Sequence, residues 1–121
     1  MKPADLKKIV IAALEDIKGK EIEVLDTRRL TPLFENMVIA SGDSTRQVKA
    51  LARNVMTKVR EAGGEVLSCE GEEGGDWVLV DLGSLVVHVM QPGARRYYNL
   101  EGLWREMPAA ERARSFSALA R

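Results

Sequence analysis

The sequence predicts a single α/β domain with a mixed five-stranded sheet and its helices mainly on one face. The chain has 121 residues, a length typical of one domain with one core. Two long segments repeat apolar residues at helical spacing, and five short segments are typical of strands. Two helices can cover only one face of such a sheet. The other face is therefore expected to be open or to be covered by a partner.

The N-terminal third is expected to fold as one helix and two strands. Apolar side chains at three- and four-residue spacing predict a helix over residues 4–18, and Gly19 is the expected C-cap. Strands are predicted over residues 21–26 and 35–42. The segment between them is a loop, because Pro32 disfavours a strand interior.

The second long helix has signals at both ends. In the segment SGDSTRQV, Ser44 and Gln47 have the capping-box spacing that satisfies orphan amides at a helix start. The apolar stripe continues to Ala62, where Gly63 and Gly64 end the helix.

The C-terminal half is expected to add three strands and further helix. Residues 65–70 read as the third strand, and a glycine-rich turn leads into a hairpin over residues 77–90. A turn and a short helix follow over residues 91–104, and the tail over residues 105–121 is predicted to be helical after Pro108.

The hairpin WVLVDLGSLVVHVM has an unusual second face. A two-residue turn at Leu82–Gly83 would place Asp81 opposite Ser84 and Trp77 opposite His88. Because side chains alternate along a strand, one face is then purely aliphatic. The other face has a mixed set of side chains: Trp77, Leu79, Asp81, Ser84, Val86, His88 and Met90.

Composition excludes several classes of protein. Hydrophobic residues make up 45% of the chain and charged residues 30%, which is ordinary for a globular protein. No apolar run approaches the ~20 residues of a membrane span, and the N-terminus MKPADLKK has no apolar signal-peptide segment. The single cysteine, Cys69, allows no internal disulfide and no cysteine metal site. We expect no membrane contact and a cytoplasmic location.

Charge is distributed unevenly although the net charge is zero. The stretch from Glu61 to Ala94 contains seven acidic residues and no lysine or arginine. A solvated acidic surface would explain this stretch, and so would a surface for a basic protein partner. A nucleic-acid site within it is disfavoured by the sign of the charge.

The sequence contains no complete catalytic motif. A phosphate loop, a dinucleotide fingerprint and a nucleophile elbow are all absent. Cys69 and His88 are both expected within strands, where they do not resemble an activated nucleophile pair. We therefore expect no catalytic residues, no metal ligands and no cofactor.

A small metal-dependent nucleotidyltransferase is the alternative function. Gly42 and Ser44 lie between a strand and a helix start, where backbone amides could hold a phosphate. Two-metal chemistry also needs neighbouring carboxylates. Neither candidate pair directly follows the loop: Glu21 with Glu23, and Glu70 with Glu72.

Three blocks of the sequence resemble the ribosomal silencing factor family, also called Iojap-like. The blocks are SGDSTRQVKALARNV, CEGEEGGDWVLVDLGSLVVHVMQP and RRYYNLEGLW. The resemblance implies an α/β domain over residues 1–104, related to nucleotidyltransferases but without their catalytic carboxylates. It further implies a non-enzymatic repressor of translation. Such a repressor binds the fourteenth protein of the large ribosomal subunit and blocks joining of the small subunit. Organellar relatives act in assembly of the large subunit.

The hairpin and the resemblance together predict a partner-binding surface. A tryptophan among acidic side chains is typical of a binding hot spot. The alternative is that Trp77 packs beneath the C-terminal segment as part of the core, and His88 fits a packing residue as well as a contact. Trp104 is expected in the core. The predicted partner-binding residues are Trp77, Leu79, Asp76, Asp81, His88, Met90, Arg96, Tyr97 and Tyr98.

Two further partners remain open. The tail from Arg105 to Arg121 has four arginines and two glutamates, so its arginines could contact rRNA phosphates, or the tail could be a solvated terminus. An exposed patch around Trp77 and Met90 could also pair with a second copy of the chain as a homodimer.

Overall fold

The structure is a computed structural model that describes residues 1–102. The predictions for Trp104 and for the tail over residues 105–121 lie outside the described residues. No helix in the described part is long and apolar enough to cross a membrane. The elements in chain order are α1 (Pro3–Asp16), β1 (Lys20–Asp26), β2 (Asn36–Ser41), α2 (Thr45–Glu61), β3 (Ser68–Glu70), β4 (Trp77–Asp81), β5 (Leu85–Met90) and α3 (Pro92–Tyr98).

Within residues 1–102, five strands form one mixed sheet in the order β1-β2-β5-β4-β3. The central pair, β2 and β5, is parallel, and the other three pairs are antiparallel. This confirms the predicted single α/β domain with a mixed five-stranded sheet. The predicted third strand is shorter than expected, because only Ser68–Glu70 pairs with β4.

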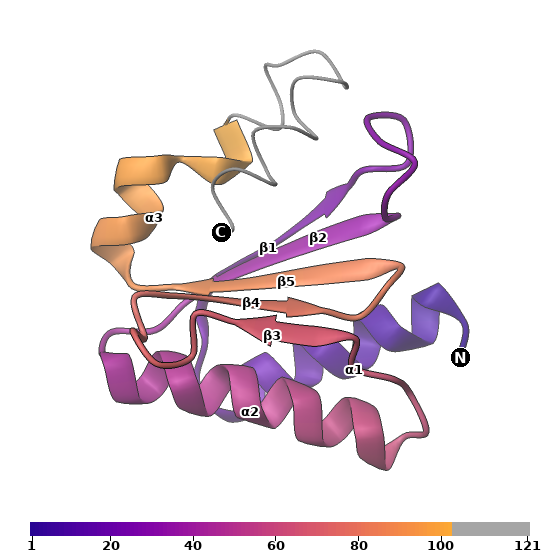
Figure 1. The fold of residues 1–121 in the computed structure, drawn as a ribbon, viewed down its shortest axis with the longest axis horizontal. Helices are drawn as coiled ribbons and strands as arrows, with labels where there is room; N and C mark the ends of the chain where they lie inside the picture. Colours follow the sequence, from indigo (N-terminus) through magenta and orange to yellow (C-terminus); the bar gives the residue numbers. More distant parts are fainter. Residues whose placement is uncertain (103–121) are drawn as a thin grey trace.

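The two long helices cover one face of the sheet, as predicted. In Figure 1, α1 and α2 lie side by side below the strands, while α3 lies on the opposite side. The aliphatic face of the hairpin packs against these helices, with Val78, Val80, Val87 and Val89 all fully buried. This face holds the larger of the two hydrophobic clusters in the described part of the chain.

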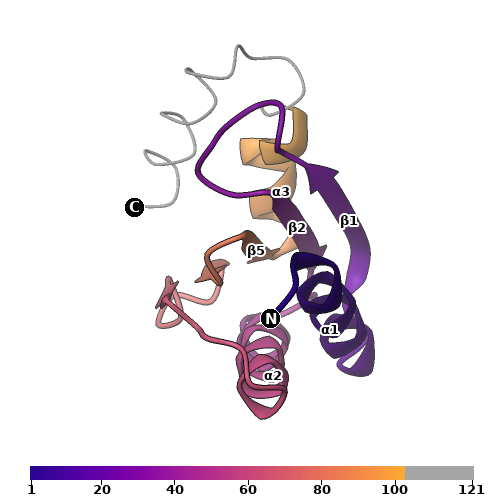
Figure 2. The ribbon, with the colours of Figure 1, turned by 90° about the vertical axis from the view of Figure 1, so that its right-hand side faces the viewer.

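The second face of the sheet is covered as well, so the expectation of an open face is wrong. Figure 2 shows the connection between β1 and β2 rising on the same side of the sheet as α3. Phe34 from that connection and Leu100 beyond α3 are buried against β2, β4 and β5. Both segments carry apolar side chains, and burying these against Met37 and Met90 removes apolar area from water.

The hairpin turn lies one residue later than predicted. The turn residues are Gly83 and Ser84, and the Leu82 N–H donates to the Leu85 carbonyl at 2.9 Å. Gly83 has φ +89°, and a tight hairpin turn favours glycine in that conformation at its first central position. Trp77 therefore lies opposite Met90 instead of His88. The register changes by two residues, so each side chain keeps its predicted face.

The helix ends follow the sequence signals with two local differences. Ser44 Oγ accepts from the Gln47 N–H at 3.1 Å, as predicted, but Gln47 Oε1 accepts from the Asp43 N–H at 2.7 Å, one residue before the cap. At the end of α1, Lys18 takes the left-handed conformation with φ +60°. Gly19, the expected C-cap, is the next residue, and its N–H donates to the Leu14 carbonyl at 2.8 Å, which completes a Schellman motif.

Candidate functional site

Four ring-bearing side chains run from the sheet interior to the surface beside α3. The Trp77 Nε1–H donates to His88 Nδ1 at 2.8 Å, and their ring centroids are 5.6 Å apart. The ring of Tyr98 lies 4.9 Å from that of Trp77, and the ring of Tyr97 lies 5.0 Å from that of Tyr98. His88 is fully buried, Trp77 is half-buried, and Tyr98 and Tyr97 are 36% and 82% exposed. We name these four side chains the aromatic row.

His88 is a neutral imidazole at the buried end of the aromatic row. Burial lowers the pKa of His88 to about 3, because the charged ring would lose its hydration. Its Nδ1 accepts the hydrogen bond from Trp77, so the ring proton of the neutral form lies on Nε2. Trp77 is thereby held by an acceptor that stays uncharged near neutral pH.

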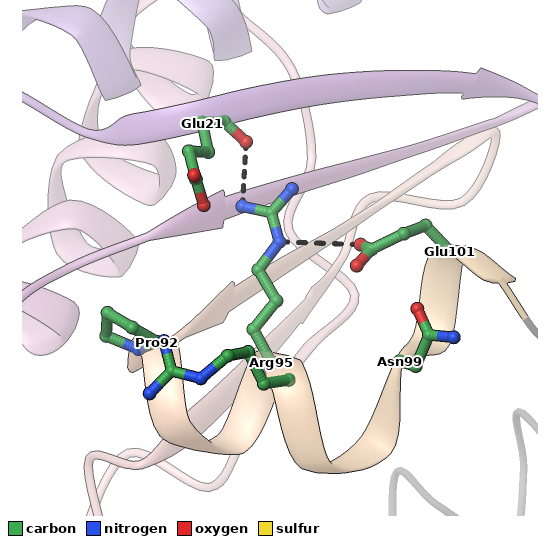
Figure 3. Close-up of a pocket in the computed structure, with 6 residues that line it drawn as sticks. Glu21, Pro92, Arg95, Asn99 and Glu101 are labelled. Carbon is green, nitrogen blue, oxygen red and sulfur yellow. Dashed lines mark hydrogen bonds and ion pairs between the residues drawn. The ribbon is translucent and has the colours of Figure 1, made fainter.

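Arg95 fixes α3 to the sheet from the inner side of that helix. Its Nη1 donates to the Glu21 carbonyl at 2.7 Å and to Ser41 Oγ at 2.9 Å. Its guanidinium also forms ion pairs with Glu23 at 3.5 Å and Glu101 at 3.4 Å. Figure 3 shows the Arg95 side chain reaching from α3 between Glu21 and Glu101.

The site predicted from the sequence includes Arg96 but not its neighbour Arg95. Arg96 is exposed, as a partner contact requires, whereas Arg95 is 8% exposed. The two arginines are adjacent and chemically identical in the sequence, so only the rotation of α3 about its axis distinguishes them. Both line a pocket between α3 and the start of β1.

Three predicted partner contacts are buried, which corrects the sequence analysis. Leu79 is 7% exposed, Met90 is fully buried, and both belong to the hydrophobic cluster under α3. His88 is buried within the sheet. The alternative for Trp77 was that it packs in the core beneath the C-terminal segment. Leu79 and Met90 do so fully, and the half-buried Trp77 does so in part.

The two predicted acidic contacts lie at opposite ends of β4. Asp81 is half-buried, and its Oδ1 accepts from the Gly83 N–H at 2.9 Å, so the carboxylate shapes the hairpin turn. Asp76 is exposed beside Trp77, and its Oδ1 accepts from Gln91 Nε2 at 3.2 Å. Of the two aspartates, Asp76 is the one next to the aromatic row.

The described residues give the nucleotidyltransferase alternative no supporting geometry. The Gly42 N–H donates to the Met90 carbonyl at 3.1 Å, and Ser44 caps α2. The two candidate glutamate pairs belong to opposite edges of the sheet, one on β1 and the other at the end of β3. Among residues 1–102 no group of three or more His, Cys, Asp or Glu side chains could hold a metal ion.

Cys69 and His88 do not form a nucleophile pair. Cys69 lies opposite Val80 and packs on the α1–α2 face, whereas His88 lies opposite Leu79 on the other face. Burial and the nearby Glu72 carboxylate raise the pKa of the Cys69 thiol, which disfavours the reactive thiolate.

Comparison with known proteins assigns the chain to a family. A family model described as "Ribosomal silencing factor during starvation" matches residues 1–120. The chain belongs to this ribosomal silencing factor family, which confirms the resemblance found in the sequence.

The relatives of this ribosomal silencing factor chain include bacterial and organellar proteins. It is 56% identical over 104 residues to "Ribosomal silencing factor RsfS" of Chromobacterium violaceum, covering 86% of this chain and 85% of that protein. It is 36% identical over 99 residues to mouse "Mitochondrial assembly of ribosomal large subunit protein 1", covering 79% of this chain and 43% of that protein.

A solved structure of a bacterial protein has the same fold. The crystal structure of a Chromobacterium violaceum protein superposes with a TM-score of 0.85 at 51% sequence identity, covering 93% of this chain and 98% of that chain. At this identity the two chains share their fold and the arrangement of their elements.

Proposed function

We propose that this chain binds the large ribosomal subunit through its fourteenth protein and represses translation by blocking joining of the small subunit. Membership of the ribosomal silencing factor family is the observation that carries the proposal. The mouse relative, named for assembly of the ribosomal large subunit, supports the choice of subunit. In this proposal the chain acts by binding and catalyses no reaction.

The proposed contact surface is the exposed end of the aromatic row with its charged neighbours. Large aromatic side chains and arginine dominate binding hot spots. Aromatic rings offer a wide contact area with few rotatable bonds to immobilise. Tyr97, Tyr98 and Arg96 are exposed on α3, Trp77 is half-buried beside them, and Asp76 is exposed at its edge. An acidic side chain there would favour a basic ribosomal protein and speed the encounter.

The buried members of the predicted set have a supporting role in this proposal. Leu79, His88 and Met90 are buried beneath the proposed contact surface, where they support it and do not contact a partner. Three further proposals remain from the sequence: a domain boundary at residue 104, a contact of the C-terminal tail with rRNA, and a homodimer.

A subunit-joining assay tests the proposed function. Purified large and small subunits are mixed with increasing amounts of the protein, and joined ribosomes are measured by sucrose-gradient sedimentation. We expect the joined fraction to fall as the protein increases, and to recover when the protein is replaced by Tyr97→Ala at the same concentration. Unchanged joining at saturating protein would contradict the proposal.

Tyr97→Ala is expected to weaken binding to large subunits by about tenfold or more, equivalent to about 1.4 kcal/mol. Because Tyr97 is 82% exposed, its removal should change the free energy of unfolding by less than about 0.5 kcal/mol. Leu33→Ala is the matched control, since Leu33 is 59% exposed on the β1–β2 connection and outside the aromatic row. Equal binding by the two variants would remove Tyr97 from the interface.

A further inference from the structure

We propose that His88 is a positioning residue for the partner-binding surface: its Nδ1 holds the Trp77 indole, and Trp77 holds the tyrosines of α3 through ring contacts. This inference rests on the proposed function and deepens it. It assigns His88 a role that differs from the partner contact predicted from the sequence.

The position of His88 makes it a rigid acceptor. It lies on β5, the middle strand of the sheet, and pairs with Ile39 of β2 on one side and Leu79 of β4 on the other. Trp77 lies opposite Met90, so His88 is its diagonal neighbour across the β4–β5 pair, a spacing that large side chains can bridge.

Packing alone does not account for an imidazole at this position. Its two cross-strand neighbours, Ile39 and Leu79, are apolar, and so is Met90 two residues further along β5. A buried polar ring is costly among such neighbours unless it is hydrogen-bonded. The indole N–H is a donor only, and His88 Nδ1 provides an acceptor at 2.8 Å. This hydrogen bond selects one orientation of the indole.

The orientation of Trp77 affects the exposed tyrosines of α3, because the rings are in direct contact. The Tyr98 ring lies 4.9 Å from the indole with an interplanar angle of 45°, and Tyr97 meets Tyr98 edge-on at 85°. A surface held in its bound arrangement loses less conformational freedom on binding. Loss of the His88 acceptor should therefore weaken binding although the exposed contact residues are unchanged.

The experiment compares His88→Asn with His88→Leu in the full chain. The two side chains have the same number of heavy atoms, branched at Cγ, but only asparagine offers an acceptor oxygen close to the position of Nδ1. The first measurement is the indole ¹⁵N–¹H signal of Trp77, assigned by its loss in Trp77→Phe, together with its rate of exchange with solvent. The second is the affinity of each folded variant for large ribosomal subunits.

We expect the wild-type indole N–H to exchange slowly. His88→Asn should keep slow exchange and bind within about threefold of wild type, whereas His88→Leu should exchange fast and bind about tenfold more weakly. Fast indole exchange in the wild-type protein would overturn the inference, and this result needs no variant to fold. Equal affinity of His88→Asn and His88→Leu would overturn it as well.

Failure of the proposed function is separable from failure of this inference. If wild-type protein does not bind large subunits, the proposed function fails. The role of His88 in holding Trp77 and α3 is still decided by indole exchange and by the Trp77–Tyr98 nuclear Overhauser contacts in the two variants. Loss of those contacts in His88→Leu alone would support it, and their retention in both variants would overturn it.

Discussion

Arg95→Ala is expected to lower the free energy of unfolding by about 3 kcal/mol, because it breaks a largely buried charge network. The Arg95 side chain is 9% exposed, and the side chains of its partners Glu23 and Glu101 are 32% and 14% exposed. Removal of the guanidinium leaves the Glu101 carboxylate in a poorly solvated position. It also removes the hydrogen bonds to the Glu21 carbonyl and to Ser41 Oγ.

Arg96→Ala is the matched control for Arg95→Ala. It deletes the same chemical group from the adjacent, exposed position, so stability should change by less than about 0.5 kcal/mol. Urea denaturation followed by circular dichroism measures both variants. Equal destabilisation by the two replacements would contradict the role of Arg95 as the anchor of α3.

Stability is expected to fall by about 2 kcal/mol between pH 7 and pH 5 through His88 alone. The folded-state pKa of His88 is about 3, below the ordinary value of 6.5. Between these two values the unfolded chain binds a proton that the folded chain excludes. Stability is therefore complete above pH 6.5 and falls by about 1.4 kcal/mol for each pH unit below it, until pH 3.

His88→Asn isolates this contribution, because asparagine does not titrate. The difference in unfolding free energy between wild type and variant, measured by urea denaturation at pH 7, 6 and 5, should change by about 2 kcal/mol in favour of the variant. The exposed Asp26, whose pKa the Arg28 hydrogen bond lowers to about 2, acts only below its ordinary value of 3.8. A constant difference across this range would show that His88 is protonated equally in both states.

Local signals in the sequence predicted most of the fold. Ser44 and Gln47 marked the start of α2, and alternation of side chains assigned each residue of the hairpin to its correct face. The turn itself was placed one residue early, because the requirement for positive φ at Gly83 could be met by two neighbouring turns in the sequence. Patterns of period two fix faces more firmly than they fix register.

Non-local packing was the part that the sequence did not reveal. The cover of the second face comes from Phe34 and Leu100, which are more than sixty residues apart in the chain. These two residues cover the sheet only because their segments fold back over it. Neither segment has the periodic pattern of apolar residues that would predict such packing. For the same reason, Leu79 and Met90 were predicted as contacts although they are buried.

The sequence predicted the site residues that belong to a motif, but not those whose role depends on contacts made in the fold. The RRYY segment and Trp77 pointed to the exposed end of the aromatic row, which the structure brings together. Arg95 is the buried anchor and Arg96 the exposed residue because of the rotation of α3 about its axis. The ion pairs of Arg95 with Glu23 and Glu101 set this rotation.

Co-sedimentation with purified ribosomal subunits tests whether this chain binds the large subunit through its fourteenth protein. We expect the protein to pellet with large subunits and not with small subunits. We also expect an excess of the isolated fourteenth protein of the large subunit to release it. The proposed function would be contradicted if the protein stays in the supernatant when large subunits pellet, or if it pellets equally with both subunits.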